Sequence, residues 1–244
     1  MLNSERRDGI YFGLVELDLL AAHAGVRFPF PLRVPEFGRI EGEREVLLAA
    51  AGVTLRARGL AGEHGPRGVA AEVVTALREY RGTVDLVLVG PDSATGVVAM
   101  VYRSWALICR QPLTGDPETP GVRIRRVAQN ALAGELIGMV PEVEPALAMP
   151  VTLPPDGGEP AVLDELGALL PELTGNGQLG ATRRGAGGDT RSGTELSWLD
   201  GPRGRVRVNR TADDWTSVNP LRQHEMRFAL DSLAMIARRE HDGS

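Results

Sequence analysis

The sequence predicts an α+β fold built around a mainly antiparallel sheet. Two groups of β-branched runs, over residues 84–127 and 179–210, are each divided by turn signals of Gly, Pro, Asp or Ser. Helical patterns surround each group, so the order strand, helices, meander, helix is followed by strand, helix, meander, helix. This repeated order predicts pseudo-twofold duplicated halves, approximately 8–140 and 146–240, within one domain of residues 1–244.

Four elements are expected before the first meander. Ile10–Val15 is rich in β-formers, and Glu16–Ala24 repeats leucine and alanine at helical spacing. Two further helices, Glu41–Arg58 and Pro66–Arg81, carry broad apolar stripes and are each followed by glycine. We expect these last two helices to form an αα-hairpin.

An extended tether over residues 28–38 separates the first of these helices from the other two. Its three prolines forbid a helix and favour an extended chain that crosses a surface. We expect its apolar side chains Phe28, Phe30 and Leu32 to pack on neighbouring helices, because burial of such side chains stabilises the fold.

The first meander is expected to contain four strands: Val84–Val89, Gly96–Tyr102, Trp105–Gln111 and Val122–Val127. A short helix, Asn130–Met139, follows them. In the next stretch, 141–160, six prolines leave Ala146–Leu153 as at best an edge strand.

The second half then contains an amphipathic helix, a second meander and a C-terminal helix. The helix is expected over Ala161–Leu170. Three strands are expected at Leu179–Arg184, Gly193–Leu199 and Arg205–Arg210. A mobile glycine-rich loop, Gly185–Ser192, connects the first two of them, and the last helix is expected over Leu221–Arg239.

Charge and cysteine content exclude several classes of protein. The chain has 244 residues and no Lys, so arginine supplies all 27 positive charges, against 32 Asp and Glu, for a net charge of −5. This acidic balance argues against a nucleic-acid partner, which needs clustered positive charge. One cysteine excludes an intramolecular disulfide and a multi-cysteine zinc site.

No segment has the pattern of a signal peptide or a membrane span. Near the N-terminus, Glu16 and Asp18 interrupt the apolar run that a signal peptide requires. The longest charge-poor stretch, Ala128–Val140, is too short to cross a bilayer. We therefore expect a cytoplasmic protein that does not insert into a membrane.

The residues that usually carry chemistry are not arranged for catalysis. Cys109 lies in a predicted strand and is expected to be a core residue. The glycine-rich segment 185–189 has neither the following helix nor the Lys of a phosphate loop. The four histidines lack the spacing of a metal site, at His23, His64, His224 and His241. The sequence therefore predicts no catalytic residue, no metal and no cofactor.

Arginines alternate with apolar residues in two predicted strands. One strand holds Arg123, Arg125 and Arg126, and the region of the other holds Arg203, Arg205, Arg207 and Arg210. Two interpretations are open. The arginines form the solvent face of half-exposed strands, as period-2 alternation generally indicates, or they form a basic sheet face that docks an acidic partner.

Several motifs, in order along almost the whole chain, resemble the EspG family of actinobacterial type VII (ESX) secretion. The most distinctive is Phe28–Leu60, where a Pro-Phe-Pro-Leu tether precedes a Glu- and Ala-rich helix that ends in Arg-Gly. The other segments that carry the resemblance are Val15-Glu16-Leu17, Val84–Leu88, Thr194–Asp200, Gly204–Val208 and Trp215–Pro220. The proline-rich region 141–160 departs from the family pattern.

The resemblance implies a central, mainly antiparallel sheet flanked by helical bundles with pseudo-twofold symmetry. It also implies the role of a cytosolic, non-enzymatic chaperone. Family members bind PPE proteins, within PE–PPE heterodimers, cover their apolar helical tips and keep them soluble and competent for export. For this chain the expected client is therefore a PPE-like protein or another ESX substrate built as a helical hairpin.

We expect the client to bind on the sheet and the C-terminal helix, with the loop Gly185–Ser192 at the edge of the surface. Loops of this kind often carry binding residues, and charged residues fix the register of a partner. The candidate contact residues are Arg183, Arg184, Asp189, Arg191 and Met226. The alternative function is a small-molecule-binding or enzymatic α+β domain whose site has no recognisable motif.

Overall fold

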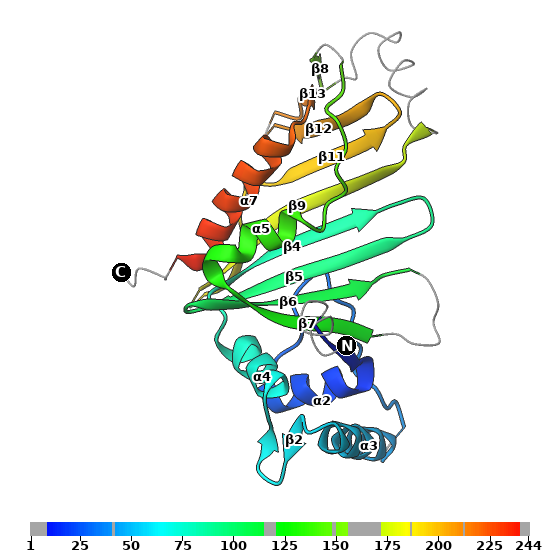
Figure 1. Cartoon of the computed structure of the whole chain (residues 1–244), viewed down its shortest axis with the longest axis vertical. Helices are drawn as coiled ribbons and strands as arrows, with labels where there is room; N and C mark the ends of the chain where they lie inside the picture. Colours follow the sequence, from blue (N-terminus) through cyan, green and yellow to red (C-terminus); the bar gives the residue numbers. More distant parts are fainter. Residues whose placement is uncertain are drawn as a thin grey trace.

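A large antiparallel sheet forms the body of the protein in the computed structural model, which describes residues 9–40, 42–114, 121–147, 150–155, 172–185, 187–211 and 213–239. Eleven strands belong to this sheet, and ten of them lie in the order β1-β7-β6-β5-β4-β9-β11-β12-β13-β8 (Figure 1). The eleventh, β10, pairs with β9. This architecture confirms the predicted α+β class.

The strands of the first half are β1 (Ile10–Gly13), β4 (Gly82–Val89), β5 (Ala94–Tyr102), β6 (Trp105–Pro112) and β7 (Gly121–Ala128). Those of the second half are β8 (Val151–Leu153), β9 (Gly175–Gly185), β10 (Gly188–Arg191), β11 (Leu196–Gly201), β12 (Gly204–Arg210) and β13 (Thr216–Pro220). The segment before the last helix, for which no strand is predicted, forms β13.

The two halves of the sheet have the same strand order. Counted from the outer edge of the sheet to its middle, the order is β1-β7-β6-β5-β4 in the first half and β8-β13-β12-β11-β9 in the second. In both halves the strand that comes first in the sequence lies at the edge, next to the strand that comes last, and the other strands follow in reverse sequence order. The halves meet where β4 pairs antiparallel with β9, from Gly82↔Arg183 to Val89↔Asn176. Duplication of the halves 8–140 and 146–240 stays a prediction, which this shared order supports.

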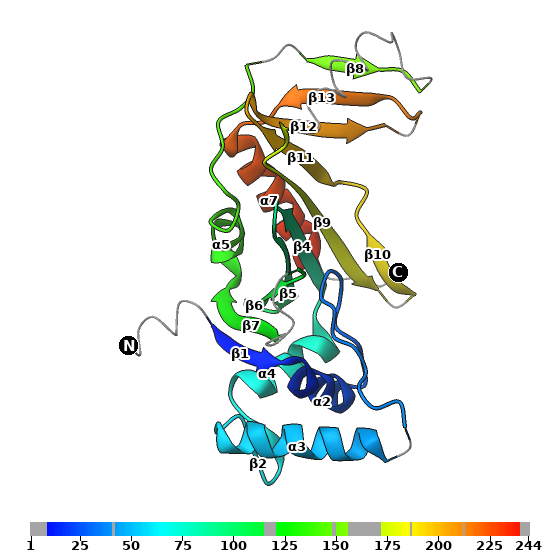
Figure 2. The same cartoon turned by 90° about the vertical axis from the view of Figure 1, so that its right-hand side faces the viewer.

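Helices cover the two faces of the sheet in separate groups (Figure 2). On one face α2 (Leu14–Ala24), α3 (Glu43–Ala57) and α4 (Val69–Glu79) enclose a core with β1, β5, β6 and β7. On the other face α5 (Leu132–Ile137) and α7 (Gln223–Arg238) enclose a second core with strands from both halves. Strands β5 and β6 are therefore buried on both faces, which explains their nearly continuous apolar sequence.

The predicted αα-hairpin is wrong. Helices α3 and α4 are joined by a short ribbon of β2 (Ala61–Gly62) and β3 (Gly65–Pro66), and each of them packs against α2. Helix α3 is fixed to α2 by charge. The Arg44 guanidinium binds Asp18, and Arg58 binds Glu16, and both carboxylates are buried. Such paired carboxylates stabilise a helix contact that apolar packing alone would not specify.

Several element boundaries differ from the prediction. Helix α2 begins at Leu14 rather than Glu16, because the Glu16 carboxylate accepts a hydrogen bond from the Gly13 amide and closes the first turn. Within the loop expected to be mobile over Gly185–Ser192, residues Gly188–Arg191 instead form strand β10, which pairs with β9. The predicted edge strand is confirmed as β8, and the helix predicted over Ala161–Leu170 lies outside the described residues.

The tether is fixed through its backbone, and one of the three apolar residues predicted to pack is exposed. The buried Gln111 side chain accepts a hydrogen bond from the Arg33 amide (2.7 Å) and donates one to the Arg33 carbonyl (3.0 Å). Leu32 is buried and Phe28 packs partly against the core, as predicted. Phe30 is 60% exposed, so its predicted packing is wrong.

The solvent-face interpretation of the arginine-rich strands fails for Arg205. This side chain is 1% exposed, and its guanidinium donates to both carboxylate oxygens of Asp200 and to the Pro141 carbonyl. In the other strand Arg125 pairs with Glu135 of α5, and Arg126 pairs with Glu72 of α4. These arginines therefore connect the sheet to the helices on both faces.

Candidate functional site

Four of the five predicted contact residues lie together on the β9–β10 hairpin, where the two halves of the sheet meet. Arg183 and Arg184 belong to β9, and they pair in register with Thr190 and Asp189 of β10. Gly188 allows the turn, because its φ of 110° is strained for other residues. The hairpin thus brings three arginines and one carboxylate to one corner of the sheet.

Arg191 fixes the hairpin to the central strands. Its guanidinium donates to Asp85 Oδ1 (2.7 Å) and Oδ2 (3.0 Å), and its Nε donates to Glu195. Asp85 is buried in β4, and Gly180 between the two residues has no Cβ to obstruct the guanidinium. The hydrogen bonds to Asp85, then to Glu195, raise the pKa of Arg191 above its ordinary value, so this side chain is a permanent cation.

Asp189 and Arg184 fix the other side of the hairpin to α4. The Tyr80 hydroxyl donates to Asp189 Oδ2 (2.9 Å), and the Arg184 guanidinium lies 4.5 Å from the centroid of the Tyr80 ring. Arg184 also donates to the carbonyls of Leu77 and Arg78, which are acceptors in the last turn of α4. Burial, then the bond to Asp189, raises the pKa of Tyr80 to about 12.

These internal bonds change the interpretation of the predicted contact residues. Arg184, Asp189 and Arg191 hold the hairpin in place, so their polar groups are already engaged in internal hydrogen bonds before any partner binds, and Arg191 is also ion-paired with Asp85. Arg183 is part-exposed, and its guanidinium has no hydrogen-bond or ion-pair partner among the residues that the structure describes. Arg183 alternates with Ala181 and Leu179 of the core under α7, so its free guanidinium lies on the opposite face of the sheet from Asp85 and Arg191. The hairpin is therefore a preorganised edge of the sheet.

Met226 does not belong to this surface. Its side chain is fully buried beneath α7, where Sδ lies 3.9 Å from Arg205 Nη1. Helix α7 packs on the opposite face of the sheet from Asp85 and Arg191, since alternate residues of β4 and β9 serve the two faces. The prediction that all five contact residues share one surface is thus wrong for Met226, which is buried, and for Arg183, which lies on the α7 face of the sheet.

The face of the sheet that carries Asp85 and Arg191 continues into a row of part-exposed apolar residues. We call this row the apolar sheet face. Its members are Val151, Leu199, Val206, Val208 and Val218. Val208, Val218 and Val151 lie directly opposite one another on three neighbouring strands, and Leu199 lies opposite Val206. Trp198 and Arg205, on alternating positions of the same strands, face the buried core instead.

Phe30 lies at the end of this surface that is nearest the first half. Its ring centroid is 5.7 Å from Cζ of Arg191, so the exposed ring is held beside the hairpin by a cation–π contact. Pro31, the next residue, lies against Gly96 of β5. The apolar sheet face, the β9–β10 hairpin and Phe30 together form the candidate protein-binding surface.

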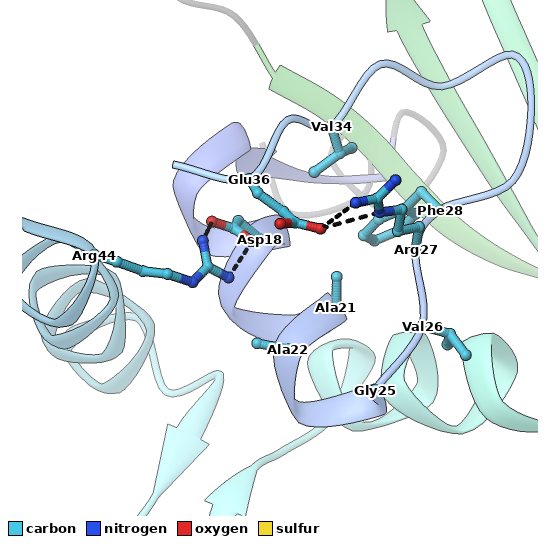
Figure 3. Close-up of a pocket in the computed structure, with 10 residues that line it drawn as sticks. All are labelled: Asp18, Ala21, Ala22, Gly25, Val26, Arg27, Phe28, Val34, Glu36 and Arg44. Carbon is cyan, nitrogen blue, oxygen red and sulfur yellow. Dashed lines mark hydrogen bonds and ion pairs between the residues drawn. The ribbon is translucent and has the colours of Figure 1, made fainter. Parts of the chain in front are cut away.

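A pocket between α2 and the tether is a concave feature near this region (Figure 3). It has a volume of about 290 Å³ and is lined by apolar residues and four charged ones. The charged residues are already paired, Asp18 with Arg44 and Arg27 with Glu36. Asp18 also accepts a hydrogen bond from the Phe37 amide. The two contacts of Asp18 hold the tether and α3 against α2.

The residues that could carry chemistry are dispersed. Cys109 is fully buried, and burial raises its thiol pKa to about 12, as expected for a core residue. Within the described part of the chain, no three His, Cys, Asp or Glu side chains come together as a metal site would require. None of the described helices is both long enough and apolar enough to cross a membrane.

Sequence reasoning missed Asp85, Tyr80 and Phe30 as partners of the hairpin. Asp85 and Arg191 are separated by 106 residues, and only the register of β4 against β9 brings them together. A carboxylate in the middle of an otherwise apolar strand was the available signal, because a buried charge requires a partner.

Comparison with known proteins identifies the relatives of this chain. The model of the EspG family matches residues 14–232. A solved structure of the Mycobacterium tuberculosis type VII secretion system chaperone EspG5, in complex with a PE25–PPE41 dimer, is similar with a TM-score of 0.66 and 14% identity. The similarity covers 93% of this chain and 96% of that one, and comparison with curated proteins returns no match. The chain belongs to the EspG family.

Proposed function

We propose that this protein is a cytoplasmic, non-enzymatic chaperone of type VII secretion that binds a PPE-like helical substrate and keeps it soluble for export. The observation that carries this proposal is membership of the EspG family over residues 14–232. The fold similarity to EspG5, which was solved in complex with a PE25–PPE41 dimer, supports the same class of client.

We further propose that the client binds the apolar sheet face, with the β9–β10 hairpin and Phe30 at its edge. The three valines aligned across β8, β12 and β13 supply a flat apolar surface that the apolar tip of a helical hairpin would cover. Phe30 supplies an exposed aromatic anchor at the edge of this surface.

The test is binding of the purified chain to a PPE-like protein encoded beside it, measured by calorimetry and by co-elution. We expect a one-to-one complex that Val208→Glu and Val218→Glu weaken by at least tenfold, since each places a charge in an apolar contact. Val46→Glu, the same change at an exposed valine of α3, is the matched control and should bind normally.

Melting curves of the free variants separate binding from folding. If no PPE-like or other ESX substrate binds the wild-type chain, the chaperone role is wrong. If the client binds but neither sheet variant affects the affinity, the role stands and the proposed surface is wrong.

A further inference from the structure

Helix α3 has two apolar faces, and only one of them is used inside the chain. Ala51 and Leu55 are buried toward α2, and the flanking Arg44 and Arg58 bind carboxylates of α2. The opposite face carries Val46, which is 69% exposed, and Val53, which is 57% exposed. Ala49, which is also exposed, lies between them. A helix on the surface of a protein normally presents polar residues to water, so an exposed row of apolar residues on this outer face is unusual.

The position of α3 leaves this face accessible. The helix lies at the end of the molecule opposite β8, with its outer side turned away from the sheet (Figures 1 and 2). A hollow of about 530 Å³ opens beside it, between α3, α2 and the β2–β3 ribbon, and Val53 and Arg56 line its wall. Side chains of a second helix laid along α3 would therefore find space next to the apolar row.

Two charged residues on the outer face indicate what kind of helix would bind there. Glu45 lies near the start of α3 and Arg56 near its end, on the same flank of the apolar row. Neither has an ion-pair partner among the residues that the structure describes, and they are about 16 Å apart along the helix, too far to pair with each other. A helix that is acidic at one end and basic at the other on the same flank is complementary to its own antiparallel copy.

We propose that the outer face of α3 is a self-association surface that pairs antiparallel with α3 of a second copy of this chain. A twofold axis near Ala50 places Val46 beside the partner's Val53 and Glu45 beside the partner's Arg56, and each contact occurs twice. Alanines at the crossing point allow the two helices to approach closely. This inference is independent of the proposed chaperone function.

The association is expected to be weak. A helix of 15 residues is about 22 Å long, and a pair of them buries less than the roughly 1,200 Å² of a stable interface. We expect a dissociation constant on the order of 10–100 µM, so that the dimer forms at high protein concentration.

Sedimentation equilibrium of the full chain over a hundredfold concentration range tests the proposal. We expect a monomer–dimer equilibrium that Glu45→Arg and Arg56→Glu each weaken by about tenfold, because each change opposes like charges at two symmetric contacts. A mixture of the two single variants should form a heterodimer, in which both contacts are again between opposite charges. The double variant E45R/R56E should also recover.

Val53→Glu tests the apolar row, and Asp231→Arg on the exposed side of α7 is the control. Val53 is solvent-exposed, so this variant should fold normally and lose the dimer, whereas the control should dimerise as the wild type does. A chain that stays monomeric throughout, or a dimer that ignores both charge reversals, overturns the proposal. So does a Val53→Glu variant that loses client binding but keeps the dimer, because the face would then belong to the client.

Discussion

Arg205 shows at the scale of a single residue why a charged side chain can be part of the core. Its guanidinium and the Asp200 carboxylate satisfy each other within the core beneath α7, beside Trp198, whose ring centroid lies 5.6 Å from Arg205 Cζ. A buried ion pair contributes little net stability, yet breaking it is costly, because the remaining charge stays buried without a partner.

We therefore predict a non-additive pair of substitutions at this site. Asp200→Leu alone should lower the free energy of unfolding by about 3–5 kcal/mol, since it leaves the Arg205 charge unpaired. The double variant D200L/R205M should recover most of that loss, because both charges are absent. Urea denaturation of the two variants and the wild type measures the difference, and a double variant less stable than D200L would contradict the prediction.

Cys109 provides a second prediction, on reactivity. The thiol is fully buried and its pKa is about 12, so it stays protonated and inaccessible at neutral pH. We expect a thiol reagent to label the native protein only at the rate of unfolding, and to label it at once in guanidinium chloride. Rapid stoichiometric labelling of the native chain would show that β6 is accessible.

At the scale of an element, the β9–β10 hairpin is held by Tyr80 and Asp189. The pKa of Tyr80 is about 12 in the folded chain, and that of an unfolded tyrosine is about 10. The Tyr80 hydroxyl therefore holds its proton more strongly in the folded state than in the unfolded state. The stability that this difference contributes is complete below about pH 10 and is lost as the pH rises toward 12.

This linkage predicts that Tyr80→Phe flattens the loss of stability between about pH 10 and pH 12. The substitution also removes the hydrogen bond to Asp189, so amide exchange in β10 should accelerate at neutral pH. Denaturation as a function of pH and hydrogen exchange measure the two effects. Tyr102→Phe is the control, because Tyr102 lies outside the hairpin and its hydroxyl donates to Glu79.

The tether provides a matched pair of residues for comparing exposure with burial. Phe30 is 60% exposed and Leu32 is 9% exposed, although they are two positions apart. We predict that Leu32→Ala lowers the free energy of unfolding by about 2–4 kcal/mol, whereas Phe30→Ala changes it by less than about 1 kcal/mol. Thermal or chemical denaturation measures both changes. A large loss of stability for Phe30→Ala would show that Phe30 packs on the neighbouring helices, as the sequence predicts.

Local patterns predicted most of the elements but not the contacts between them. Strands β4 to β7 and the buried stripe of α7 follow from periodicity and turn residues, which are properties of neighbouring positions. The alternation of arginine and valine in β12 is the same whether Arg205 faces water or a buried carboxylate, so it could not predict the ion pair with Asp200. The partners of the hairpin depend on strand register across more than 100 residues, which no local pattern contains.

At the scale of the whole molecule, the core beneath α7 joins the two halves. Val84, Leu86 and Leu132 of the first half share this core with Trp198 and Leu230 of the second. We predict a single cooperative unfolding transition in calorimetry, with equal calorimetric and van't Hoff enthalpies. Two resolved transitions would mean that the halves are separate domains.

The seam between β4 and β9 also has a consequence during synthesis on the ribosome. All the strands from β1 to β7 lie within residues 10–128, so the first half of the sheet leaves the ribosome before β9 exists. Until then the outer edge of β4, with Val84 and Leu86 along it, has free backbone donors and acceptors that would pair with any neighbouring chain. The nascent protein is therefore itself prone to aggregate for the time needed to translate the segment between β7 and β9.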